Sequence, residues 1–141
     1  MDLKTVPGGP MAPLFVYLAY QAVHAPLQAP ADYIARCPTV KEPRRRILCG
    51  MMTAVDEGVR NVTETLAAAG RTNYTLIFTT DNGGTGASAG TNWPLRGQKA
   101  TMWEGGVRGV GFVAGAGIPP AVAGTTSHTL IHVTDWFTWH R

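Results

Sequence analysis

The sequence predicts an α/β fold in which a central mixed or parallel sheet is flanked by helices. Two apolar runs of strand length, residues 14–20 and residues 75–80, are continuous rather than alternating. This pattern is typical of strands that are buried on both faces of a parallel sheet. A long amphipathic segment separates the two runs. The order strand, helix, strand indicates a right-handed crossover between them.

The helix between these strands is predicted from residue 46 to residue 69. Its apolar side chains recur at the spacing of one helical face, and Gly70 suits the end of the helix. Asn61 and Asn73 each begin an N-x-Thr sequon, so both are predicted glycosylation sites. Asn61 lies about 120° from the centre of the apolar face, so a glycan there would point away from the core. The apolar face consists of Ile47, Leu48, Met51, Met52, Val55, Val59, Val62 and Leu66.

The rest of the chain is predicted to be rich in loops, because it holds 17 Gly and 10 Pro among 141 residues. Residues 23–30, 81–101 and 115–126 are expected to be mostly irregular. Residues 109–114 form a third strand candidate, and residues 128–136 form a fourth element of uncertain type. The length sets a limit of one domain, which we take as residues 1–141.

Charge and hydropathy argue against two classes of protein. The net charge is +3, and much of the excess comes from Lys41 and the run Arg44-Arg45-Arg46. No aromatic residues are interleaved with this run, so we expect a solvated loop before the helix and no nucleic-acid partner. No apolar run is long enough to span a membrane, and residues 1–11 lack the profile of a signal peptide.

The two cysteines leave two alternatives open. Cys37 and Cys49 form a disulfide in an oxidising compartment, or Cys49 is a buried thiol. The spacing alone does not decide between them.

Polar residues that suit a metal ion follow the ends of the first two predicted strands. His24 lies just past residues 14–20, and Asp81 and Asn82 lie just past residues 75–80. Because ligands gather beyond the carboxyl ends of parallel strands, we expect these three side chains at one rim. The Asp81 carboxylate and the Asn82 carbonyl oxygen suit Ca²⁺ or Mg²⁺. The alternative is a capped turn, since Asp-Asn-Gly-Gly also favours turns.

Three motifs in the second half of the chain resemble the sulfatase family. They are TDNGG at residues 80–84, NWPLRGQK at residues 92–99 and WEGGVRG at residues 103–109. Within that family, the resemblance is to the arylsulfatase B, I and J group, and it runs from about residue 13 to about residue 136. It implies a partial alkaline-phosphatase-like sulfatase fold, with this chain as the central portion of one incomplete catalytic domain.

The resemblance also implies roles for four side chains. Asp81 and Asn82 match family ligands to one Ca²⁺ ion, whose other ligands are carboxylates on an earlier strand, so the ligand set in this chain is incomplete. His24 and Lys99 match residues that contact the substrate sulfate, and they are the predicted catalytic and substrate-binding pair. The Lys99 ammonium would offset charge that develops on the ester in the transition state.

Two other segments that match the family are expected to be structural. In residues 104–108 the glycines allow close backbone approach, and Glu104 or Arg108 is expected to fix the loop through buried hydrogen bonds. Residues 135–136 are expected to pack the sheet, so His128, His132 and Asp135 receive no catalytic role.

The family's nucleophile has no counterpart in this sequence. It is an aldehyde hydrate made from the cysteine of a Cys-x-Pro-x-Arg motif, and neither Cys37 nor Cys49 lies in such a motif. We therefore expect a lysosomal or secreted sulfuric ester hydrolase fragment, for a sulfate-ester small molecule or sulfated glycan, that is inactive alone. The alternatives are a non-catalytic anion- or partner-binding fragment and a phosphatase or phosphodiesterase of the same superfamily.

Overall fold

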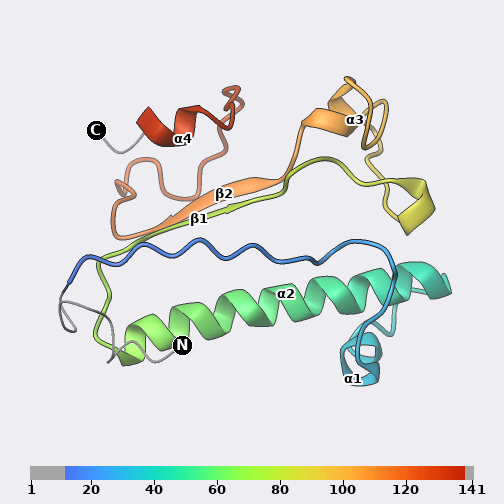
Figure 1. Cartoon of the computed structure of the whole chain (residues 1–141), viewed down its shortest axis with the longest axis horizontal. Helices are drawn as coiled ribbons and strands as arrows, with labels where there is room; N and C mark the ends of the chain where they lie inside the picture. The colour runs from blue at the N-terminus through green and yellow to red at the C-terminus, as the bar shows by residue number, and fades with distance from the viewer. Residues whose placement is uncertain (1–11, 139–141) are drawn as a thin grey trace.

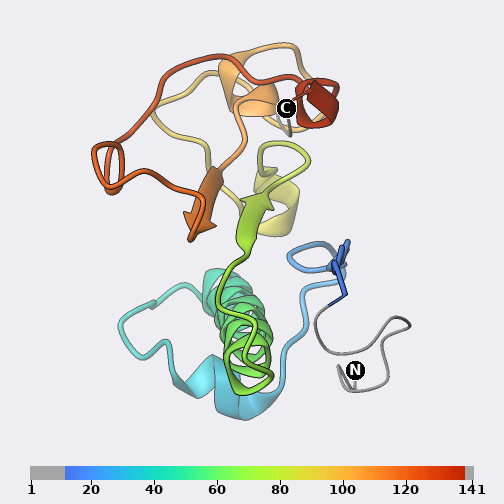
Figure 2. The same cartoon turned by 90° about the vertical axis from the view of Figure 1, so that its left-hand side faces the viewer.

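One long helix and a pair of strands organise the computed structural model, which describes residues 12–138. Helix α2 (Pro43–Ala68) runs along nearly the whole length of the molecule on one side of strands β1 (Thr75–Thr79) and β2 (Gly111–Gly115). The short helices α3 (Glu104–Val107) and α4 (Asp135–Thr138) lie on the other side of the strands (Figure 1). Seen end-on, α2 and the strands form separate layers (Figure 2).

Helix α2 begins earlier than the apolar pattern predicts, because residues outside that pattern cap it. Glu42 is the N-cap, and its carboxylate accepts hydrogen bonds from the backbone N–H groups of Arg44 (3.1 Å) and Arg45 (2.6 Å). Pro43 occupies the first turn, where its missing N–H is harmless. Gly70 (φ +70°) ends the helix as predicted, and the Arg71 N–H donates to the Leu66 carbonyl (2.9 Å).

The buried apolar core lies where α1 (Ala31–Ala35) packs against α2. Cys37, Met51 and Val55 are the buried apolar side chains of the described residues. Gly50 lets the two helices approach, because an added Cβ would lie 3.0 Å from Ile34 Cγ1. The sequence analysis did not identify α1, since five residues carry too little periodicity to predict a helix.

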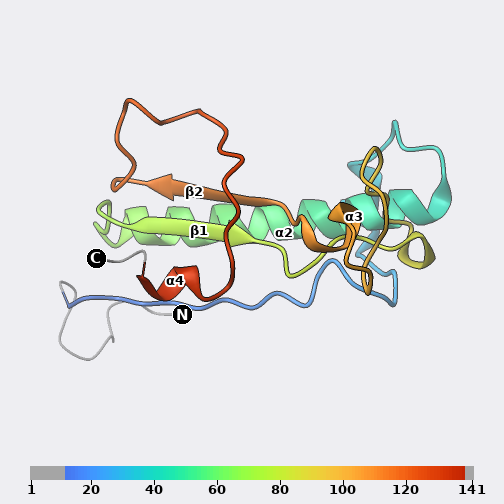
Figure 3. The ribbon, with the colours of Figure 1, turned by 90° about the horizontal axis from the view of Figure 1, so that it is seen from above.

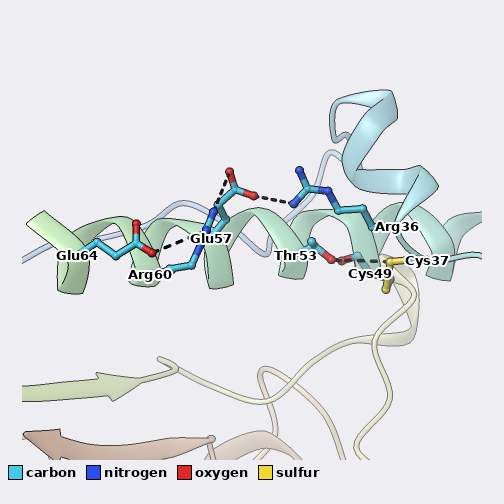
Figure 4. Close-up of polar contacts among 7 residues, drawn as sticks. All are labelled: Arg36, Cys37, Cys49, Thr53, Glu57, Arg60 and Glu64. Atoms are coloured by element: carbon cyan, nitrogen blue, oxygen red, sulfur yellow. Dashed lines mark hydrogen bonds and ion pairs between the residues drawn. A yellow bond between two sulfur atoms is a disulfide. The ribbon is translucent and has the colours of Figure 1, made fainter.

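A disulfide and an ion pair close this helix pair (Figure 4). Cys37 and Cys49 are bonded to each other, which confirms the disulfide alternative. Arg36 Nη1 donates to Glu57 Oε2 at 2.6 Å, and Figure 4 shows both side chains reaching across the outer surface of α2. This hydrogen bond lowers the pKa of Glu57 below its usual range and raises that of Arg36.

The sheet among the described residues has two antiparallel strands, whereas we predicted a mixed or parallel sheet. Ile77 pairs with Val113, and Phe78 pairs with Phe112, whose ring it stacks against at 5.1 Å between centroids. Side chains on β1 alternate between exposed and half-buried, so the prediction that this strand is buried on both faces is wrong for this chain. Predicted residues 75–80 and 109–114 otherwise agree with β1 and β2 within a residue or two.

The predicted strand at residues 14–20 is not a strand in the structure. Residues 13–22 are extended and run in the same direction as β1, on the side of β1 away from β2 (Figures 1 and 3). Within residues 12–138 they form no backbone hydrogen bonds, and Phe15 and Tyr17 are 85% and 84% exposed. A strand exists only beside a partner, and no described residue pairs with this segment.

The remaining segments agree with their predicted irregularity. Residues 23–30 and 81–101 form loops and turns, apart from the short 3-10 helix η2 (Gly86–Ser88), and residues 115–126 form turns. The uncertain element at 128–136 is irregular until α4 begins at Asp135. None of the helices described for residues 12–138 is both long and apolar enough to cross a membrane.

Candidate functional site

A cleft near the start of α2 brings together residues from the extended segment, α2 and the end of β1. It has a volume of about 550 Å³. Its lining includes His24 and Asp81, which are far apart in the sequence, and Met51 from α2. The expectation of one shared rim is therefore met for His24 and Asp81, although the extended segment and β1 are not hydrogen-bonded neighbours. Asn82, the third residue expected there, is not among the lining residues. The other lining residues are Tyr20, Gln21, Ala22, Ala25, Pro26 and Gln28.

His24 and Lys99 meet at this cleft across 75 residues of sequence. Lys99 Nζ lies 3.2 Å from His24 Nε2, and His24 Nδ1 lies 2.9 Å from the Ala25 carbonyl oxygen. A carbonyl only accepts, so Nδ1 carries the proton and Nε2 is left to accept from the Lys99 ammonium. The two side chains that were predicted to contact sulfate thus lie within hydrogen-bond distance of each other. Their catalytic roles stay predictions.

Asp81 and Asn82 follow β1 directly and offer two oxygen ligands. Asp81 lines the cleft, and Asn82 Oδ1 is buried without a hydrogen-bond partner among residues 12–138. A buried carbonyl oxygen with no donor is costly, and a bound cation would satisfy it. Both oxygens are hard ligands, so the pair fits Ca²⁺, but roughly six to eight ligands are needed. The described residues hold no cluster of three or more His, Cys, Asp and Glu side chains suited to a metal.

Close backbone packing holds the turn after β1 against the loop that carries Lys99. The Gly83 N–H donates to the Gly106 carbonyl (3.0 Å), and the Lys99 N–H donates to the Gly84 carbonyl (3.2 Å). Gly105 and Gly106 are buried, and a Cβ on either would overlap a backbone carbonyl oxygen. The predicted structural role of these glycines in residues 104–108 agrees with this packing.

The charged residues of that segment are exposed, so the prediction of buried hydrogen bonds there is wrong. Arg108 Nη1 lies 3.3 Å from Glu104 Oε2, and both side chains are about half exposed. Arg108 also contacts His128 Nδ1 at 3.3 Å. Because α3 is only one turn long, its side chains project into solvent while its glycines pack inward. His132 and Asp135 contact each other through the His132 N–H (2.7 Å), away from the cleft lining.

The arginine run also differs from its predicted position in a solvated loop. It lies in the first turn of α2, where Arg44 donates to the Ala87 carbonyl and Arg45 Nη1 donates to the Ala89 carbonyl (2.9 Å). These bonds tie loop 85–90 to the start of α2. No local pattern in the sequence indicates contacts across more than 40 residues.

Both predicted glycosylation residues are exposed. Asn61 lies on α2 and Asn73 lies in the turn before β1. Their modification stays a prediction.

The chain belongs to the sulfatase family, since the family model "Sulfatase" matches residues 6–139. It is similar to mouse arylsulfatase J, with 45% identity over 129 residues, which are 91% of this chain and 21% of that protein. It is also 30% identical over 132 residues to mouse N-acetylgalactosamine-6-sulfatase, covering 90% of this chain and 24% of that protein. The predicted resemblance to the arylsulfatase group is confirmed. The chain spans about a fifth to a quarter of these relatives.

Solved structures confirm the fold class. Ps i-CgsB in complex with k-i-k-neocarrahexaose matches 73% of this chain and 22% of its own, with a TM-score of 0.65 and 36% identity. The structure of Ps i-CgsB matches 69% of this chain and 21% of its own, with a TM-score of 0.62 and 37% identity. The chain therefore has part of an alkaline-phosphatase-like α/β fold.

Proposed function

We propose that this chain is the part of a calcium-dependent arylsulfatase that binds the sulfate group and supplies two ligands to the metal. The observation that carries the proposal is the contact of Lys99 Nζ with His24 Nε2 (3.2 Å) at a cleft that Asp81 also lines. At and beside this cleft the cation, the imidazole and the carboxylate supply the electrophilic, acid–base and metal-binding groups that an ester-cleaving site needs. The family match and the likeness to arylsulfatase J support a sulfuric ester over a phosphate ester.

In this proposal each side chain acts on one part of the ester. The Lys99 ammonium exchanges its hydrogen bond to His24 for one to a sulfate oxygen, where negative charge develops in the transition state. His24 Nδ1–H remains on the Ala25 carbonyl and orients the ring. Once Lys99 has turned to the sulfate, Nε2 takes up a proton from solvent, and the resulting imidazolium donates that proton to the departing oxygen. Asp81 and Asn82 would hold Ca²⁺, which when bound neutralises charge on the sulfate.

The nucleophile has no source in this chain. Cys37 and Cys49 are the only cysteines of the sequence, and they are bonded to each other. The aldehyde hydrate of the family has to come from a part of the catalytic domain that this chain does not contain. We therefore expect the isolated chain to be inactive toward aryl sulfates and to bind calcium weakly.

The test uses a chimera in which this segment replaces the matched residues of mouse arylsulfatase J. Lys99→Ala in the chimera should lower kcat for an aryl sulfate by roughly 10²–10³, the usual loss for one such contact. Lys41→Ala, which removes another exposed lysine, is the matched control and should leave the rate unchanged. Equal rates for the two variants, at equal thermal stability, would exclude the proposed role of Lys99.

The same disulfide supports a second candidate, a non-catalytic protein that binds an anion at this cleft. Without a nucleophile, His24 and Lys99 can hold a sulfate ester but cannot transfer its sulfuryl group. Calorimetry of the isolated chain with an aryl sulfate separates the two. Saturable binding that Lys99→Ala removes, together with an inactive chimera, would favour this candidate.

We also propose that the protein is lysosomal or secreted and carries glycans on Asn61 and Asn73. A disulfide persists in oxidising compartments, and both asparagines are exposed. N-glycosidase treatment of protein expressed in the secretory pathway should shift its mass, and Asn61→Gln with Asn73→Gln should remove the shift. An unchanged mass in wild type would contradict the glycan assignment.

A further inference from the structure

Asn92 connects the two turns that carry the candidate site residues. Its Oδ1 accepts from the Gly84 N–H (2.9 Å), and its Nδ2 donates to the Gly84 carbonyl (2.9 Å) and to the Gly97 carbonyl (3.2 Å). The amide therefore pairs with Gly84 as one peptide group pairs with another. Because an N–H only donates and a carbonyl only accepts, these partners also define which end of the amide is which.

The two glycines that bond to Asn92 lie next to the candidate site residues. Gly84 follows Asp81 and Asn82 in the same turn, and Gly97 precedes Lys99 in the next loop. The Gly84 carbonyl accepts from both Asn92 Nδ2 and the Lys99 N–H (3.2 Å). The Asn92 amide thus reinforces the direct bond from Lys99 to Gly84 and adds a connection from Gly84 to Gly97, between the candidate metal ligands and the lysine that would contact sulfate.

Few other side chains could make this connection. Aspartate has the same shape but no N–H group, so its carboxylate would face two carbonyl oxygens. Glutamine is longer by one methylene. Gly83 leaves room for the amide, since an added Cβ there would lie 3.2 Å from Asn92 Oδ1, closer than most Cβ contacts.

The turn also has supports that do not involve Asn92. Gly83 bonds to Gly106 (3.0 Å), and the Gly105 N–H donates to the Arg96 carbonyl (2.7 Å). These bonds and the bond from the Lys99 N–H to the Gly84 carbonyl (3.2 Å) hold the loops together, but none of them connects Gly84 with Gly97. Loss of Asn92 should therefore loosen the spacing of the two turns more than it unfolds them.

We propose that Asn92 is a positioning residue that holds the Asp81–Asn82 turn and the Lys99 loop at the separation needed to bind metal and sulfate together. The proposal rests on the proposed function of this site. Partners that orient metal ligands typically change metal affinity or activity by 10–100-fold when they are removed. We expect an effect of that size.

The test compares Asn92→Asp and Asn92→Ala with Thr85→Ala in the arylsulfatase J chimera. Thr85 is the matched control, because its Oγ1 accepts from the Ala87 N–H (3.1 Å) within the same loop but does not connect the two turns. Calcium titration of the metal-free protein should show affinity roughly 10–100-fold weaker in both Asn92 variants, with Asp81→Ala as the reference for a lost ligand. Thr85→Ala should match wild type.

Amide hydrogen exchange in the metal-free chimera provides a readout that does not depend on metal. Asn92→Ala should speed exchange at Gly84, which donates to Asn92, and at Lys99, whose acceptor Asn92 holds in place. Exchange in α2 should be unchanged. Unchanged calcium affinity and unchanged exchange at both amides would overturn the proposal.

The other outcomes separate this proposal from the proposed function. A wild-type chimera that binds no calcium contradicts the calcium site but leaves the exchange test of Asn92 in force. Calcium binding that needs Asp81 but not Asn92 keeps the site and overturns the role of Asn92. Failure of both Asn92 variants to fold, where Thr85→Ala folds, would show that Asn92 supports the fold rather than positions the site.

Discussion

The α1–α2 pair and the two-stranded sheet bury apolar side chains to very different degrees. The helix pair holds Cys37, Met51 and Val55, each less than a tenth exposed. In the sheet, Ile77 is 36% exposed and Phe112 is 48% exposed. The helix pair completes its core with residues close in the sequence, whereas the sheet has apolar surface that nothing among residues 12–138 covers.

The difference indicates which parts of the fold are locally encoded. The contacts that join α1 to α2 all form within one continuous segment. They are a disulfide that spans 12 residues and the Arg36–Glu57 ion pair. The sheet pairs β1 with β2 from a segment more than 30 residues further along the chain, and this chain spans about a fifth of arylsulfatase J, whose other strands it does not contain. We therefore expect the isolated chain to keep a stable helix pair beside a sheet that opens easily and exposes edges prone to aggregation.

Removal of the disulfide should have the largest effect on this contrast. Cys37→Ser with Cys49→Ser should destabilise the helix pair by about 3 kcal/mol, the chain-entropy value for a loop of roughly 15 residues. Hydrogen exchange should show the loss of protection in α2 and little change in β1. Thr53→Ala, which removes a hydrogen bond to the Cys49 carbonyl (2.9 Å), should lower stability by only about 1 kcal/mol. An equal loss in both regions would show that they unfold as one unit.

A side chain at Gly50 should have the next largest effect. Its Cβ would lie 3.0 Å from both Ile34 Cγ1 and the Ile34 backbone nitrogen, so Gly50→Val should separate α1 from α2. Overpacking of this kind typically destabilises by about 1–3 kcal/mol. Gly86→Ala, where an added Cβ meets nothing within 4 Å, is the control. A melting temperature for Gly50→Val equal to that of the control would contradict the packing.

In the sheet, Phe112→Leu should have a smaller effect, confined to the strands. It removes the stacked ring pair with Phe78, which contributes about 0.5–1.5 kcal/mol beyond burial. We expect faster exchange at the paired amides of β1 and unchanged protection in α2. Val122→Ala, a substitution of an exposed residue outside the sheet, serves as the control. Loss of protection in α2 would mean that the sheet supports the helix.

Acidification should have the smallest effect, at the start of α2. The Glu42 carboxylate accepts from the N–H groups of Arg45 and Arg44, which lowers its pKa below 4.5. A lowered folded-state pKa stabilises the helix above pH 4.5, and this contribution is lost as the pH falls through the folded value. Circular dichroism from pH 7 to pH 3 should show the helix content of the wild type falling as the Glu42 carboxylate becomes protonated. Glu42→Gln should remove the part of this response that comes from the cap and leave the part that comes from the Arg36–Glu57 ion pair, whereas Asp56→Asn should keep both.

The elements that could be predicted were those with a strong local pattern. Helix α2 follows from its apolar face and Gly70, and β1 follows from a run bounded by turn residues. The meeting of His24 and Asp81 followed from their positions after two apolar runs, even though residues 13–22 form no strand. The path of the chain brings His24 and Asp81 together even though no backbone hydrogen bonds join the two segments that precede them.

The features that could not be predicted depend on contacts between distant residues. Helix α1 is defined by its packing on Gly50 and by the disulfide rather than by periodicity. The role of Asn92 is invisible in the sequence, since an asparagine among glycines reads as a turn residue. The Asn92 amide can make its hydrogen bonds only once folding has placed Gly84 and Gly97 on either side of it.

The contact of His24 with Lys99 also has a consequence during protein synthesis. The ribosome adds the lysine 75 residues after the histidine, which takes roughly 4–15 s at about 5–20 residues per second. Throughout that interval the loop that carries Lys99 does not yet exist. The two side chains of the candidate site therefore meet only seconds after the histidine has been made. The loop does not cover residues 14–20, where Phe15 and Tyr17 stay 85% and 84% exposed, and we expect chaperones to bind there first.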